Sequence, residues 1–145
     1  VCKHTLNPSI LSGVKHLNRL ENIMARQEWK GDDYADGILL DQNGYVIECI
    51  SSNIFMRIGK TIYTPKISQV GIKGVTRGLI IKISMKLGFK IKETTFKLNK
   101  LLESDEVFIT NSLFGVLQVK KIKNKSWQHQ ELASLFNQSL ENLNT

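Results

Sequence analysis

Apolar residues recur at spacings of three and four in three parts of the chain, and each part is predicted to form a helix. The first helix is expected from about residue 17 to Trp29, with its apolar side made by Leu17, Leu20, Ile23, Met24 and Ala25. The second is expected to begin at Thr76, whose hydroxyl would cap it, and to end at Gly88. A closing helix is predicted over about residues 127–143, and a short one over 98–104.

Segments typical of strands lie between these helices. Residues 37–41 and 45–48 flank Asn43-Gly44, a pair that favours a type I′ hairpin turn because both residues accept a positive φ. Glu48 is therefore expected at the far end of the return strand. Further strands are predicted near Leu6 and over 53–57, 61–64, 89–96, 106–110 and part of 113–122. Because the second helix joins strands too distant in sequence for a hairpin, the pattern favours an α/β fold.

The composition indicates one globular domain over residues 1–145. The chain is 41% hydrophobic and 23% charged, and it has two prolines and ten glycines. No apolar run approaches the ~20 residues of a membrane helix, so no membrane span is expected. The chain begins at Val1, with neither an initiator methionine nor a secretory leader, as the middle of a longer protein would. Cys2 and Cys49 have no metal-ligand spacing, which favours reduced thiols in a cytoplasmic protein without a metal site.

The net charge of +7 permits nucleic acid or anionic molecules as partners. The lysines are spread along the chain, and the densest run, residues 120–125, contains no aromatic residue for base stacking. A solvated hairpin or loop explains this run better than a nucleic-acid patch. We therefore expect that nucleic acid is not a partner, and a basic nucleic-acid-binding module is the remote alternative.

Three features carry candidate chemistry: Lys15 ahead of the first helix, Glu48 at a strand end, and the start of the helix at Thr76. A helix start offers free N–H groups and partial positive charge, so Val75 and Thr76 are candidates to hold a phosphate, with Ser112 and Asn111 adding a hydroxyl and an amide. The alternative is that Thr76 only caps its helix and Ser112 only turns the chain. A lysine, a carboxylate and a phosphate cradle are together what a pyridoxal phosphate site requires.

Five stretches, in order, resemble the class IV (fold type IV) pyridoxal phosphate enzymes. They are Gly13-Val14-Lys15-His16-Leu17-Asn18-Arg19-Leu20-Glu21, Asp41-Gln42-Asn43-Gly44-Tyr45-Val46-Ile47-Glu48, Ser52-Asn53-Ile54-Phe55, Tyr63-Thr64-Pro65 and Gly74-Val75-Thr76-Arg77. The family includes branched-chain and D-amino acid aminotransferases and aminodeoxychorismate lyase, and the run that follows Lys15 is most similar to the lyase.

The resemblance implies a role for each matching residue. Lys15 would form the Schiff base with the cofactor and act as general acid and base, and Glu48 would pair with the pyridine nitrogen. Val75, Thr76 and Ser112 would bind the phosphate. Asn18 and Asn53 match positions near the cofactor. A strand-end Glu48 in a surface ion pair is the structural alternative.

The resemblance also implies the large, C-terminal domain of the family fold, with mixed strands in a quasi-barrel and flanking helices. The small N-terminal domain of the family would be absent, so this piece alone is expected to be inactive. The implied parent enzyme is a homodimer that converts 4-amino-4-deoxychorismate to 4-aminobenzoate and pyruvate in folate synthesis. An aminotransferase acting on D-amino or branched-chain amino acids is the alternative.

Overall fold

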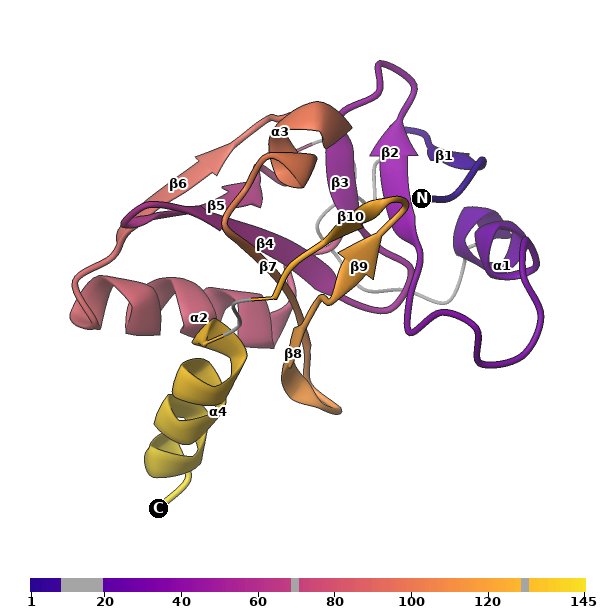
Figure 1. Ribbon diagram of the computed structural model, residues 1–145. Coiled ribbons are helices and arrows are strands. Elements are labelled where there is room, and N and C mark those ends of the chain that lie inside the picture. Colours follow the sequence, from indigo (N-terminus) through magenta and orange to yellow (C-terminus); the bar gives the residue numbers. More distant parts are fainter. Residues whose placement is uncertain (9–19, 69–70, 129–130) are drawn as a thin grey trace.

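A computed structural model describes residues 1–8, 20–68, 71–128 and 131–145. Two sheets of different size form its centre (Figure 1). The larger has five strands in the order β6-β5-β4-β7-β8, and the smaller has three in the order β1-β2-β3. The bounds of the first five strands are β1 (Thr5–Leu6), β2 (Ile38–Asp41), β3 (Val46–Cys49), β4 (Asn53–Ile58) and β5 (Thr61–Pro65). Those of the rest are β6 (Lys90–Thr94), β7 (Glu106–Asn111), β8 (Gly115–Gln118), β9 (Lys121–Ile122) and β10 (Lys125–Ser126).

The helices are α1 (Leu20–Arg26), α2 (Val75–Lys86), α3 (Leu98–Leu102) and α4 (Leu132–Leu143). α2 carries the chain from β5 to β6, and these two neighbouring strands run parallel. The other pairs of the large sheet are antiparallel. The predicted α/β fold is therefore confirmed, and α2 is the crossover helix of the mixed large sheet.

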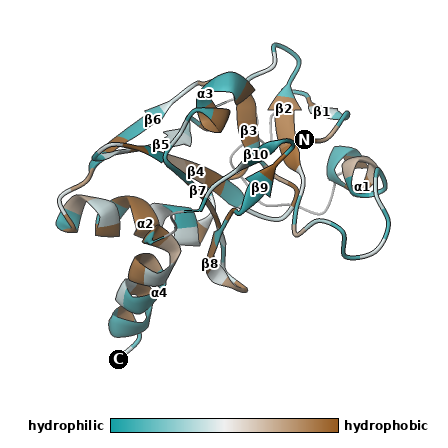
Figure 2. Cartoon of the chain, viewed as in Figure 1, coloured by the Kyte–Doolittle hydropathy of each residue, from teal (hydrophilic) through white to brown (hydrophobic). Residues whose placement is uncertain are grey.

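Successive side chains of the central strands β4 and β7 point to opposite faces of the large sheet and form an apolar layer on each face. Phe55 of β4 and Phe108 of β7 stack with their ring centroids 5.0 Å apart on the face covered by α2 and α4, where Phe136 joins them. Ile54, Met56, Val107 and Ile109 point to the opposite face, toward the small sheet and α3. Figure 2 shows the contrast between the brown central strands and the teal edge strand β6. Side chains two residues apart on one strand thus share a face.

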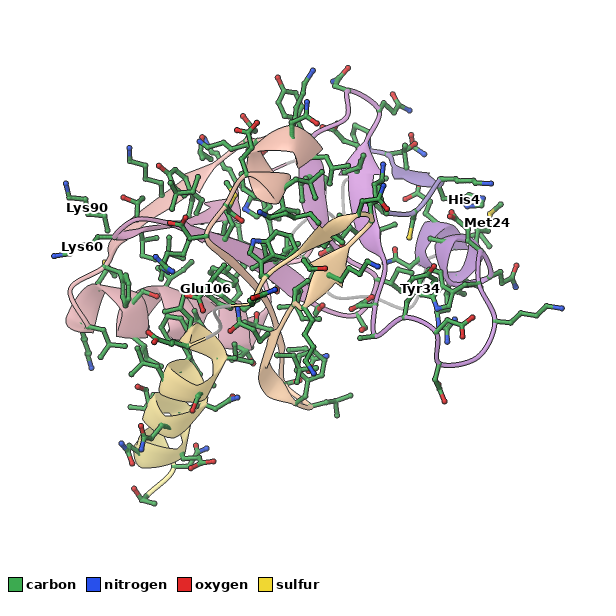
Figure 3. All side chains as sticks on the ribbon, viewed as in Figure 1. His4, Met24, Tyr34, Lys60, Lys90 and Glu106 are labelled. Atoms are coloured by element: carbon green, nitrogen blue, oxygen red, sulfur yellow. The ribbon has the colours of Figure 1, made fainter. Side chains whose placement is uncertain are left out.

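Glu106 connects α4 to the large sheet. Its Oε2 accepts a hydrogen bond from Arg57 Nε at 2.8 Å, and its Oε1 accepts one from the N–H of Glu131 at 2.6 Å. Figure 3 shows Glu106 near the start of α4. A buried carboxylate at a helix start complements the dipole of that helix.

Four sequence predictions about local structure were wrong, and the first concerns the turn at Asn43-Gly44. Gly44 has φ of +82°, but among the described residues other than glycine only Lys123 has a positive φ, so the turn at Asn43-Gly44 is not type I′. Instead Asp41 Oδ1 accepts hydrogen bonds from the N–H groups of Asn43 and Tyr45, and a register shift follows in the β2–β3 pair. The side chain of Asp41 thus organises the connection between β2 and β3, residues 42–45.

The first helix presents a different face from the one predicted. Leu20, Ile23 and Met24 are exposed, whereas Asn22 and Ala25 are buried. Asn22 is accommodated because its Nδ2 donates to the carbonyl of Ile50 at 3.2 Å. Residues 17–19 of the predicted helix lie outside the described residues.

The remaining differences are at helix ends. The cap of α2 is Gly74, so Thr76 is the second residue of the helix and not its cap. α4 begins at Leu132, later than predicted. Lys125–Ser126 pair with Lys121–Ile122 as a small hairpin, and Trp127 extends it, because its backbone N–H donates to the carbonyl of Lys120 at 3.0 Å. This hairpin includes the lysine-rich run and agrees with its predicted form. None of the helices in the described part is long and apolar enough to cross a membrane.

Candidate active site

A cavity of about 450 Å³ opens where β3, the turn before β4, the start of α2 and the end of β7 meet. Its lining contains six of the eight residues singled out from the sequence: Glu48, Asn53, Val75, Thr76, Asn111 and Ser112. These residues come from four separate parts of the chain. The other two, Lys15 and Asn18, lie outside the described residues. The fold thus gathers every candidate whose position is described into one cavity.

Glu48 is the acidic residue in the wall of this cavity. It is the third of the four residues of β3, is 3% exposed, and accepts a hydrogen bond at Oε2 from the N–H of Ile72 at 2.9 Å. Gly71 makes this approach possible, because it has φ of +93° and an added Cβ would lie 2.9 Å from Ile47 Cγ2. Since Glu48 is buried, it is not the carboxylate of a surface ion pair.

The start of α2 forms another part of the wall. Its cap, Gly74, has no side chain that could accept a hydrogen bond from the first turn, and that turn contains no acidic residue. Val75 is 80% exposed, while Thr76 is buried to 8% exposure. An uncapped helix start directs N–H donors and partial positive charge outward, and it is a favourable place for an anion. Lys73 lines the cavity beside it and adds a full positive charge.

Asn53 holds the segment that leads into α2. Its Nδ2 donates to the carbonyl of Ile72 at 2.8 Å, and its Oδ1 occupies the space where a side chain on Gly74 would begin. Ile72 therefore contacts Glu48 through its N–H and Asn53 through its carbonyl. One loop residue couples the acidic wall of the cavity to the helix start.

Asn111 shapes the turn that carries Ser112. Its Nδ2 donates to the carbonyl of Ser51 at 3.0 Å, and its Oδ1 accepts from the N–H groups of Leu113 and Phe114, each at 3.0 Å. The amide is thus bonded to the protein at both ends. Its contribution to the cavity is to position the wall.

Sequence reasoning missed Asp36, which holds a pair of serines in the cavity wall. Asp36 Oδ2 accepts hydrogen bonds from the hydroxyls of Ser51 and Ser52, both at 2.8 Å, and Oδ1 accepts from the N–H of Gly37. The fifteen-residue separation between Asp36 and Ser51 hides this pairing from local pattern analysis. The one local feature of the sequence that could have pointed to Asp36 is its position directly before the strand predicted to begin at Gly37.

Cys49 also lines the cavity, and its thiol is buried. Burial, and next the nearby carboxylate of Asp36, raise the pKa of Cys49 well above its usual value. The thiol is therefore protonated near neutral pH. Within residues 1–8, 20–68, 71–128 and 131–145, no group of three or more histidine, cysteine or acidic side chains lies close enough to hold a metal.

The model of the family described as "Amino-transferase class IV" matches residues 3–122. The chain belongs to this family. It is 34% identical over 123 residues to an aminodeoxychorismate lyase of Vibrio harveyi, a match that covers 84% of this chain and 45% of that protein. It is 37% identical over 100 residues to a probable branched-chain-amino-acid aminotransferase of Rickettsia felis, with 69% of this chain and 34% of that protein covered.

The fold agrees with a solved structure of this class. The crystal structure of 4-amino-4-deoxychorismate lyase from Pseudomonas aeruginosa matches with a TM-score of 0.93 and 31% identity, covering 98% of this chain and 53% of that one. The chain therefore spans about half the length of the relatives that it matches. The resemblance identified in the sequence is confirmed at the level of the family and its fold.

Proposed function

We propose that this chain forms the pyridoxal phosphate-binding part of a lyase that converts 4-amino-4-deoxychorismate to 4-aminobenzoate and pyruvate. The observation that carries the proposal is the pairing, in one cavity, of the buried carboxylate of Glu48 with the uncapped start of α2. The class IV family and the relatives named as lyases support it.

The cavity fits the cofactor in size and in chemistry. Small-molecule sites commonly measure about 300–1,000 Å³, and this one measures about 450 Å³. The start of α2, Thr76 and Ser112 would hold the phosphate, and Glu48 would face the pyridine nitrogen and keep it protonated. Bound pyridoxal phosphate supplies an aldehyde that captures amines and a ring that accepts electrons from a neighbouring C–H bond.

Lys15 would attach to the cofactor and later move the reacting proton. In the proposed reaction, its amine would take the proton from the ring carbon beside the substrate nitrogen. The bond between the ring and the enolpyruvyl oxygen would then break, so that the ring becomes aromatic and the departing enolate takes up a proton to give pyruvate. Glu48 assists by stabilising positive charge on the cofactor ring. Asp36 contributes by holding Ser51 and Ser52 in the wall.

An aminotransferase of the same family is the second candidate, favoured by the identity to the Rickettsia felis protein. It would use Lys15 and Glu48 in the same positions. The two functions differ in product, so the full-length protein is incubated with aminodeoxychorismate and, separately, with a branched-chain or D-amino acid and a keto acid. Formation of 4-aminobenzoate supports the lyase, whereas transfer of the amino group supports the aminotransferase.

The proposed cofactor site is tested with Glu48→Gln and a matched control, Glu106→Gln. Glu106 is also a buried carboxylate, but it is absent from the cavity wall. Loss of a hydrogen bond to a charged group costs about 1.5–3 kcal/mol, so we expect Glu48→Gln to weaken pyridoxal phosphate binding by roughly 10- to 100-fold. Glu106→Gln should leave the affinity unchanged. Equal affinities in all three proteins would refute the role of Glu48.

Steeply salt-dependent binding to nucleic acid, without binding of pyridoxal phosphate, would instead support a basic binding module. This measurement separates the remote alternative from both enzyme functions.

A further inference from the structure

Thr110, in the wall of the cavity, has a buried hydroxyl for which the described residues provide no hydrogen-bond partner. Thr110 lies on β7, lines the cavity and is 0% exposed, yet its Oγ1 has no hydrogen-bond partner in the part of the chain that the structure describes. Burial of a hydroxyl without a hydrogen bond is unfavourable, and such groups are rare in native proteins. An unpaired hydroxyl in a cavity wall is available to hydrogen-bond a molecule bound in the cavity.

Three other buried hydroxyls, in β5, in α2 and in the turn between α3 and β7, show the usual arrangement. Thr64, also 0% exposed, donates to the carbonyl of Ile54 at 2.8 Å. Ser84 donates to the carbonyl of Ile80 at 2.7 Å, and Ser104 donates to that of Leu101 at 2.6 Å. The hydroxyl of Thr110, in the cavity wall, has no such carbonyl partner among the described residues.

The register of the sheet places Thr110 beside the start of α2. Thr110 lies directly opposite Asn53 in the antiparallel β4–β7 pair, and opposite residues share a face. α2 covers that face. Phe55, two residues after Asn53, and Phe108, two residues before Thr110, lie on the same face and pack against this helix. Asn53 in turn abuts Gly74, the cap of α2.

We propose that the hydroxyl of Thr110 donates a hydrogen bond to the phosphate of bound pyridoxal phosphate. This assignment rests on the proposed function and adds Thr110 to the residues expected at the start of α2. A rotation about χ1 exchanges the methyl and the hydroxyl of a threonine, and here it breaks no hydrogen bond because the hydroxyl has none. An anion at an uncapped helix start is the acceptor that this position favours.

The test replaces the hydroxyl by a methyl group in Thr110→Val, in the full-length protein. We expect the dissociation constant for pyridoxal phosphate to rise about tenfold, which corresponds to about 1.4 kcal/mol. The unfolding midpoint of the cofactor-free protein should stay the same or rise, because an unpaired buried hydroxyl has been removed. Binding of pyridoxal, which lacks the phosphate, should not change. Thr110→Ser retains a hydroxyl and should bind pyridoxal phosphate within about twofold of the parent.

Thr64→Val is the matched control, because the hydroxyl of Thr64 is bonded within the protein. It should lower the unfolding midpoint and leave the affinity for pyridoxal phosphate unchanged. The opposite pattern is expected for Thr110→Val. A general effect of removing a buried threonine hydroxyl would give the same pattern at both positions.

Three results would overturn the assignment while leaving the proposed function intact, provided that the parent protein binds pyridoxal phosphate. They are an unchanged affinity in Thr110→Val, an equal loss of affinity for pyridoxal, and a loss in Thr110→Ser as large as in Thr110→Val. If the parent protein does not bind pyridoxal phosphate, the proposed function and this assignment both fail.

Discussion

Two glycines near the start of α2 are expected to respond in opposite ways to the same substitution. Gly74, the cap of α2, has φ of −64° and ψ of 146°, which an alanine adopts without strain. An added Cβ, however, would collide with Oδ1 of Asn53. Gly78 lies inside α2 and would place its Cβ where no atom lies within 4 Å. Gly74→Ala thus perturbs packing, whereas Gly78→Ala changes only helix propensity.

The magnitudes follow from these surroundings. Overpacking at Gly74 costs about 1–3 kcal/mol, and displacement of Asn53 breaks its 2.8 Å hydrogen bond to the carbonyl of Ile72, which costs about 1 kcal/mol. Reduced freedom of the unfolded chain offsets about 0.4–1 kcal/mol of this. Gly74→Ala should therefore destabilise the protein by about 1–3 kcal/mol. Gly78→Ala should stabilise it by about 0.5–1 kcal/mol.

Urea unfolding of both variants, compared with the parent protein, measures these changes. Titration with pyridoxal phosphate provides the second readout, since Asn53 and Ile72 join the wall at Glu48 to the start of α2. We expect weaker binding in Gly74→Ala and unchanged binding in Gly78→Ala. A Gly74→Ala protein that is as stable as Gly78→Ala and binds the cofactor normally would refute the packing account.

Three further predictions concern buried charges and thiols. Glu106→Ala should destabilise the protein by about 1.5–3 kcal/mol in urea, because it removes the buried carboxylate that pairs with Arg57 at 2.8 Å and leaves that guanidinium with Asp105 at 3.5 Å; a loss below about 0.5 kcal/mol would contradict this. Burial raises the pKa of Glu28, but hydrogen bonds from the backbone N–H groups of Lys3 and His4 outweigh that effect and lower the pKa below its usual value. The stability that these hydrogen bonds contribute is therefore present above the pKa of the unfolded chain and is lost as the pH falls through the folded pKa. Glu28→Gln should therefore be less stable than the parent at neutral pH and approach it in acid, and a constant difference would contradict this. Burial, followed by Glu28, raises the pKa of Cys2 to about 11, and burial also raises that of Cys49, so both thiols should resist alkylation at pH 8 until the protein unfolds; rapid alkylation of the folded protein would contradict this.

Local sequence pattern was sufficient to place Glu48, since the hairpin around Gly44 determines where the return strand ends. The turn type was wrong because it depends on the side chain of Asp41 and not on the Asn-Gly pair alone. Thr76 was wrongly assigned as a helix cap because the contact between Gly74 and Asn53 joins residues 21 apart in sequence. Local patterns contain no information about such contacts.

The same reasoning explains the error in α1 and the omission of Thr110. Periodicity predicts which residues share a helix face, but Asn22 is buried because a distant carbonyl, that of Ile50, satisfies its amide. Thr110 was visible in the sequence only as one residue of a β-branched strand. Its position opposite Asn53, near the start of α2, follows from the pairing of β4 with β7.

The most direct test of the account is to identify the lysine that reacts with the cofactor. The full-length protein is incubated with pyridoxal phosphate, reduced with borohydride and digested, and the labelled peptide is sequenced by mass spectrometry. We predict a phosphopyridoxyl group on Lys15, loss of that label in Lys15→Ala, and a label that stays on Lys15 in Lys73→Ala. Labelling of another lysine, or cofactor binding that is equal with and without the Lys15 amine, would contradict the central claim.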